Sequence, residues 1–175
     1  MKRTTKITFC GMMSALATAL MLFSHFPYLT YAIPAVAGLF IMLLVIETDC
    51  RWAFLGYLVS SVLVFLFAEL ESKLMYVGLF GYYPIIKALI ERIRKPVFEW
   101  TIKLLCFFAA VSAVYFVLAK PLGVDIEDFG ILGNYGAVIL LIFGAFVFVL
   151  YDIAVSRMAM MYIRVLQSRL RKILK

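Results

Sequence analysis

The feature that most constrains this chain is a succession of apolar segments, each long enough to cross a membrane. A helix needs about 20 predominantly apolar residues to cross the hydrocarbon core of a bilayer. In lipid every backbone N–H and C=O has to be paired within the protein, so only helices and closed barrels can span. The segments are continuously apolar rather than alternating, which favours helices. The sequence therefore predicts an all-α polytopic membrane protein, a bundle of six transmembrane helices with both termini cytoplasmic.

The predicted spans are residues 7–26, 28–46, 52–68, 74–90, 100–119 and 135–155. Hydrophobic residues make up 66% of the 175-residue chain and charged residues only 15%, too few charges to cover a soluble domain. We expect residues 1–156 to form the six-helix transmembrane domain and residues 157–175 to form a basic amphipathic cytoplasmic tail. This tail either continues the last span or lies on the anionic inner leaflet. A charged start before an apolar run also fits a cleaved signal peptide, and we interpret the first run as a retained span.

The positive charges predict the orientation. Cations accumulate on the cytoplasmic side of membrane proteins. With the N-terminus inside, all 17 lysine and arginine residues except Lys73 and Lys120 fall on the cytoplasmic side. We therefore attribute the net charge of +7 to the orientation of the chain in the membrane and to contact with membrane lipids. We expect no nucleic-acid partner.

Catalytic and metal chemistry find little support in the sequence. The single histidine, His25, has no second histidine beside it to share a metal ion, and Cys10, Cys50 and Cys106 lack metal-site spacing. The serines within the spans have no credible base, and such hydroxyls more often pack or bond to their own backbone. We therefore expect neither an enzyme nor a cofactor or metal site.

Three charged residues lie inside the predicted spans. Lys87, Lys103 and Asp152 all fall in the inner third of the membrane by residue counting. Intramembrane charges can mark an ion pathway, but an ion-driven carrier should show polar residues near the midplane and broken helices in repeated halves. We favour a structural pair between Lys87 and Asp152 over ion coupling.

Small residues recur on one face of the first span. Gly11, Ala15 and Ala19 follow each other at four-residue intervals. Small residues at this spacing let another helix backbone approach closely, which stabilises helix association in lipid. This face either packs within the chain or contacts a partner.

Aromatic and polar residues gather at the predicted outer ends of the helices. Tyrosine belts at the membrane interface account for part of this. In the fourth span, Gly78 and Gly81 thin the helix, and Pro84 can bend it and free a carbonyl. We expect an outer recess that binds a small polar solute. The candidate substrate-binding residues are Tyr31, Glu69, Glu71, Tyr76, Tyr82, Tyr83, Asn134 and Tyr135.

The chain resembles the substrate-binding S components of energy-coupling factor vitamin transporters. The resemblance rests on length, on six spans with both ends inside, and on the opening "KITFCGMMSALATAL" with its Ala-xxx-Ala at Ala15 and Ala19. It implies that the Gly11, Ala15 and Ala19 face contacts a transmembrane coupling subunit driven by two cytoplasmic ATPases. It also implies that a vitamin-like micronutrient binds in the outer half and that the protein resides in the plasma membrane of a bacterium.

Two other functions remain open from the sequence. A non-transporting scaffold or morphogenesis subunit, similar to rod-shape-determining membrane proteins, would use the same small-residue face and basic tail to hold partners. A self-contained carrier or channel would move solute without any partner.

Overall fold

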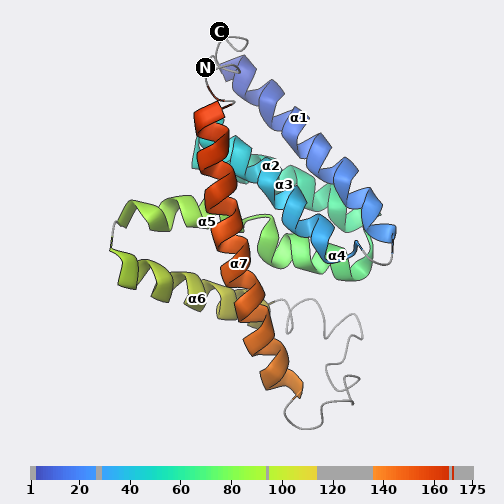
Figure 1. The fold of residues 1–175 in the computed structure, drawn as a ribbon. Coiled ribbons are helices and arrows are strands. Elements are labelled where there is room, and N and C mark those ends of the chain that lie inside the picture. The colour runs from blue at the N-terminus through green and yellow to red at the C-terminus, as the bar shows by residue number, and fades with distance from the viewer. Residues whose placement is uncertain (1–2, 27–28, 94, 114–135, 166, 168–175) are drawn as a thin grey trace.

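The computed structural model describes residues 3–26, 29–93, 95–113, 136–165 and 167, and this part of the chain is all-α. The chain begins with helix α1, which a 3-10 turn, η1, follows. The last helix, α7, ends near the end of the molecule at which α1 starts (Figure 1). The elements are α1 (Arg3–Leu22), η1 (Phe23–His25), α2 (Ala32–Glu47), α3 (Cys50–Phe67), α4 (Leu70–Met75), η2 (Tyr76–Phe80), α5 (Tyr83–Ile90), η3 (Glu91–Ile93), α6 (Pro96–Ala113) and α7 (Gly136–Val165).

Among the described residues, four helical stretches are long and apolar enough to cross a membrane. They are Arg3–His25, Cys50–Phe67, Leu70–Ile93 and Leu141–Val165. The helix Ala32–Glu47 is apolar but shorter. Of the predicted span at residues 100–119, the part up to Ala113 is helical in α6, and the rest lies outside the described residues. The protein is therefore a helical multi-pass membrane protein, with a helix in each of the six segments that the sequence predicts to span.

Helix α2 lies at the centre of the fold. It contacts α1, α3, α5, η2 and α7. Its sequence is apolar on every side, which is typical of a helix surrounded by protein. Pro34 sits in its first turn, where a missing N–H breaks no helical hydrogen bond. The neighbouring helices therefore assemble around α2.

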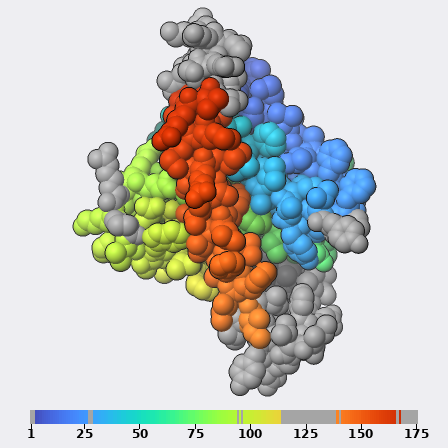
Figure 2. Space-filling model, in the orientation of Figure 1, coloured from blue at the N-terminus to red at the C-terminus, as the bar shows by residue number. Residues whose placement is uncertain are grey.

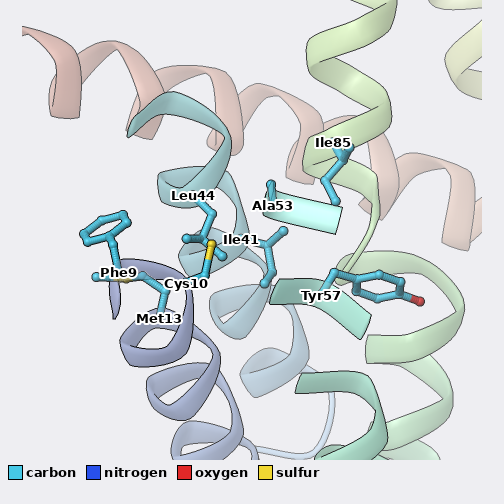
Figure 3. Close-up of a cluster of buried hydrophobic side chains, with 8 residues drawn as sticks. All are labelled: Phe9, Cys10, Met13, Ile41, Leu44, Ala53, Tyr57 and Ile85. Carbon is cyan, nitrogen blue, oxygen red and sulfur yellow. The ribbon is translucent and has the colours of Figure 1, made fainter. Parts of the chain in front are cut away.

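Three groups of buried side chains hold the described helices together, and one of them, which includes Met21, Ala37, Val64 and Tyr76, lies near the end of α1. The first joins α1, α2, α3 and α5, and Figure 3 shows its members on these helices: Phe9, Cys10, Met13, Ile41, Leu44, Ala53, Tyr57 and Ile85. The second is mostly aromatic and joins α2, η2, α5, α6 and α7. In it, the ring of Phe148 stacks on Phe107 at 4.9 Å between centroids and meets the edge of Tyr83 at 4.7 Å. Aromatic pairs of this geometry stabilise beyond the area they bury, by about 0.5–1.5 kcal/mol.

Helix α7 runs along one face of the molecule, between the α1–α2 side and the α5–α6 side (Figure 2). It continues without a break past residue 156 to Val165, so the start of the predicted tail extends the last span. Its outward side carries exposed apolar residues such as Phe143, Phe146 and Leu150. Exposed apolar side chains along a long helix match a surface that faces lipid.

The stretch from Leu70 to Ile93 is not one regular helix. Between α4 and α5 the chain forms the π-helical turn η2, in which the N–H of Gly81 donates to the carbonyl of Tyr76, five residues back, at 2.8 Å. Pro84 follows in the first turn of α5 and has no N–H to offer the carbonyl of Phe80. The sequence predicts that Pro84 can bend this span, and the structure has an irregular turn directly before it.

The centre of α2 approaches this interruption closely at Gly38. A Cβ atom on Gly38 would lie 2.5 Å from the carbonyl oxygen of Phe80 and 2.6 Å from the hydroxyl of Tyr151. Only glycine therefore fits between η2 and α7 without displacing backbone. A Cβ atom on Gly11, in contrast, would meet nothing within 4 Å.

We predict that Gly38→Ala lowers the free energy of unfolding by about 1–3 kcal/mol, because the added methyl group overpacks a site bounded by backbone. Gly11→Ala is the matched control, and it should leave stability unchanged or raise it by up to about 1 kcal/mol through helix propensity. Thermal unfolding in detergent measures both. Equal stability of the two variants would contradict the close approach.

Candidate functional site

The first candidate site is a polar cluster at the end of α1 opposite to its start. Here the beginning of α2 meets the beginning of α4. The Thr30 hydroxyl donates to Glu69 Oε2 at 3.2 Å, and the Tyr31 hydroxyl donates to Glu71 Oε2 at 2.6 Å. The Ser72 hydroxyl donates to the Thr30 carbonyl at 2.9 Å. The structure thus brings together three of the predicted site residues, Tyr31, Glu69 and Glu71.

This polar cluster is acidic and open; we call it the outer cluster because the sequence predicts that this end of the bundle faces outward. Glu69, Glu71 and Tyr31 are exposed, the tyrosine by 61% of its surface. Two carboxylates that each accept one neutral hydroxyl retain unused lone pairs. A ligand with a cationic or hydrogen-donating group is the chemical partner that such a cluster can take.

The second candidate site is a buried ionic cluster between α5, α6 and α7. Asp152 of α7 forms ion pairs with Lys87 of α5 through Oδ1 and with Lys103 of α6 through Oδ2, the latter at 3.1 Å. The Tyr83 hydroxyl donates to the same carboxylate at 2.5 Å. Asp152, Lys87 and Lys103 are each at most 4% exposed. The predicted pairing of Lys87 with Asp152 is confirmed.

Two glutamates on the rim complete the ionic cluster. Glu91 lies 2.9 Å from Lys87 and 3.4 Å from Lys103, and Glu99 lies 2.7 Å from Lys103. Both glutamates are more exposed than the buried ions. Each buried charge therefore has partners of opposite sign, which is the condition for tolerating ions in a low-dielectric interior.

The other predicted site residues are distributed over different places. Tyr76 is buried, and its hydroxyl lies 2.8 Å from Ser60 Oγ. Tyr82 is half-buried and meets the edge of the Tyr57 ring at 6.0 Å between centroids. Tyr83 belongs to the ionic cluster. Asn134 and Tyr135 lie outside the described residues.

A side chain donates a hydrogen bond to one of the backbone carbonyls of η2. The Tyr57 hydroxyl donates to the Val77 carbonyl at 2.7 Å. Within lipid an unpaired carbonyl is costly, so this hydroxyl stabilises the irregular turn. Broken helices of this kind line many transport sites, where their free backbone groups face a ligand.

The predicted partner face of α1 points away from the rest of the fold. Gly11, Ala15 and Ala19 are all exposed. The opposite side of α1 makes the contacts to α3, where the Ser14 hydroxyl donates to the Gly56 carbonyl at 2.9 Å. Packing within the described chain therefore does not use the small-residue face.

At the start of α1, Lys6 pairs with Asp49, the residue that precedes α3, at 2.5 Å. The hydrogen bond from Lys6 and its positive charge hold the pKa of the Asp49 carboxyl below its usual value. This pair places the beginning of α1 and the α2–α3 connection at one end of the bundle, opposite to the outer cluster.

Sequence reasoning missed two features of these sites. It gave Lys103 no partner, and it assigned Tyr83 to the outer recess, whereas the structure places both side chains against Asp152. The available signal was the four-residue spacing of Tyr83, Lys87 and Glu91, which puts all three on one face of a helix.

The described residues contain no group of three or more histidine, cysteine, aspartate or glutamate side chains that could hold a metal ion. No protein-family model, curated protein or solved structure matches the chain.

We predict that Asp152→Asn destabilises the fold by about 3–5 kcal/mol, because it leaves two buried ammonium groups without their shared carboxylate. Replacing the four buried members together by apolar residues of similar shape (Y83F, K87M, K103M and D152L) should recover most of this loss. Chemical unfolding in detergent measures both variants. A stable Asp152→Asn protein would contradict a structural role for the ionic cluster.

Proposed function

We propose that this protein is the substrate-capturing membrane subunit of a micronutrient uptake transporter in a bacterial plasma membrane, energised by partner coupling and ATPase subunits. The observation that carries the proposal is the exposure of Gly11, Ala15 and Ala19 on α1. This surface coincides with the face that the resemblance to S components assigns to the coupling subunit.

The physical argument concerns what a lipid-facing helix gains from small residues. Large apolar residues such as leucine and phenylalanine contact lipid tails at least as well as small residues do, and the outward side of α7 carries them. Close contact with another helix requires small residues, because they let the two backbones approach. A small-residue face that the fold leaves open is therefore suited to a partner helix.

The outer cluster is the proposed place of capture. The exposed oxygens of Glu69 and Glu71 accept from Thr30 and Tyr31, and a solute with donor groups can replace these hydroxyls. Tyr31 supplies an aromatic surface beside them. With the basic end of the bundle in the cytoplasm, this cluster faces outward, and the partner that grips α1 reorients the loaded subunit.

A second candidate function is a non-transporting scaffold. The observation in its favour is that the outer side chains hydrogen-bond to one another and tie α2 to α4, as purely structural residues would. A scaffold would use the same α1 face to hold a partner but would carry no solute.

We predict that Ala15→Leu combined with Ala19→Leu abolishes partner co-purification and solute uptake in the native host. Because both positions are exposed, the free energy of unfolding should change by less than about 0.5 kcal/mol. Ala17→Leu, on the buried side of α1, is the matched control: it should destabilise the fold by about 1–3 kcal/mol. If the double variant retains its partners, the proposed docking face is wrong.

Capture itself is tested by mass spectrometry of small molecules released from protein purified in mild detergent. We expect one stoichiometric polar metabolite, lost on Glu69→Gln combined with Glu71→Gln and retained on Ala15→Leu. Lipid alone, together with co-purifying membrane partners, would favour the scaffold. Solute flux through the protein reconstituted without partners would instead identify a self-contained carrier.

A further inference from the structure

A groove of about 770 Å³ opens at the basic end of the bundle, between the start of α3 and the end of α5. Its lining changes from charged to apolar. The residues that line it are Asp49, Cys50, Arg51, Trp52, Phe54, Ile85, Leu89 and Arg92. The volume lies in the range of pockets that enclose small ligands.

The charged part of the groove is positive. Arg51 and Arg92 are both exposed, and in the described part of the chain neither guanidinium has a carboxylate within ion-pair distance. The one carboxylate of the lining, Asp49, is already neutralised by Lys6. The groove therefore presents two unpaired cations to an anionic partner.

The apolar part of the groove suits an acyl chain. Phe54 is 47% exposed and Leu89 is 48% exposed, and Ile85, a buried member of the core, also lines the groove. Trp52, between Arg51 and Phe54 in the chain, also lines the groove, and tryptophan favours the level where hydrocarbon meets headgroups. A free phosphate would use only the arginines and leave these apolar walls exposed.

We propose that this groove binds an anionic phospholipid of the surrounding leaflet, with the headgroup phosphate on Arg51 and Arg92 and an acyl chain along Phe54 and Leu89. Arginine matches phosphate geometry with paired hydrogen bonds, and basic pockets between membrane helices on the cytoplasmic side are suited to such headgroups. The inference depends on the helices lying in a membrane and not on solute capture, so it can fail or hold independently of the proposed function.

The two tryptophans of the chain make a direct test available. In Trp100→Phe, Trp52 is the only tryptophan and reports on the groove. This variant is reconstituted into phosphatidylcholine vesicles that contain increasing fractions of phosphatidylglycerol or phosphatidylcholine brominated near the top of the acyl chains. We expect brominated phosphatidylglycerol to quench Trp52 at about tenfold lower mole fraction. Both lipids carry a phosphate, but the choline cation makes phosphatidylcholine neutral and is repelled by Arg51 and Arg92, whereas phosphatidylglycerol keeps its negative charge.

Removing the two cations should remove the preference. Arg51→Gln combined with Arg92→Gln, in the same Trp100→Phe background, should bring both lipids to equal quenching. Arg157→Gln combined with Arg164→Gln, on exposed positions of α7, removes the same charge elsewhere and should keep the preference. Soluble glycerol phosphate should not displace the lipid. Equal quenching by both lipids in the parent, or an unchanged preference in the Arg51 and Arg92 variant, would overturn the proposal, as would displacement by glycerol phosphate.

Discussion

The arrangement of α5, α6 and α7 depends on one carboxylate. Asp152 uses both oxygens, one toward Lys87 and the other toward Lys103, so a single side chain joins three helices. Ions in an apolar interior are stable only with partners in good geometry. The ionic cluster therefore selects among ways of packing these helices, since any arrangement that separates the three charges leaves at least one of them unpaired.

A second constraint, the pairing of backbone groups, explains the irregular centre of the fold. Between α4 and α5 the chain leaves the regular helix, and the turn persists because Gly81 donates to Tyr76 and Tyr57 serves the Val77 carbonyl. The same region is approached by α2 at Gly38. A π turn adds a residue to the helix and rotates everything after it, so Tyr82 and Tyr83 are carried to different neighbours, Tyr57 and Asp152.

The sequence could predict where the helices lie along the chain but not this rotation of the residues after the π turn. Continuous hydrophobicity predicts where the helices run, and residue counting predicts that Lys87 and Asp152 lie at similar depth, because both follow from the rise of a helix and the thickness of a bilayer. The ion pair between them agrees with a common level. The direction in which each side chain points around the helix axis cannot be predicted in the same way. In a span that is apolar all round, no periodicity distinguishes the side that faces protein from the side that faces lipid. The sequence therefore predicts Tyr83 in the outer recess, whereas the structure places it against Asp152. Tyr31 and Glu71, both at helix ends, do hydrogen-bond to each other.

The two faces of α1 show how a membrane protein separates folding from association. Ser14 bonds to the backbone of α3 and Ala17 is completely buried, so one side of the helix is committed to the fold. Gly11, Ala15 and Ala19 lie on the other side and contribute no comparable contact. Because lipid provides no hydrophobic force between helices, association at such a face rests on backbone proximity alone. A bulky side chain there removes that proximity without touching the packed side, and binding to a partner can thus vary independently of folding.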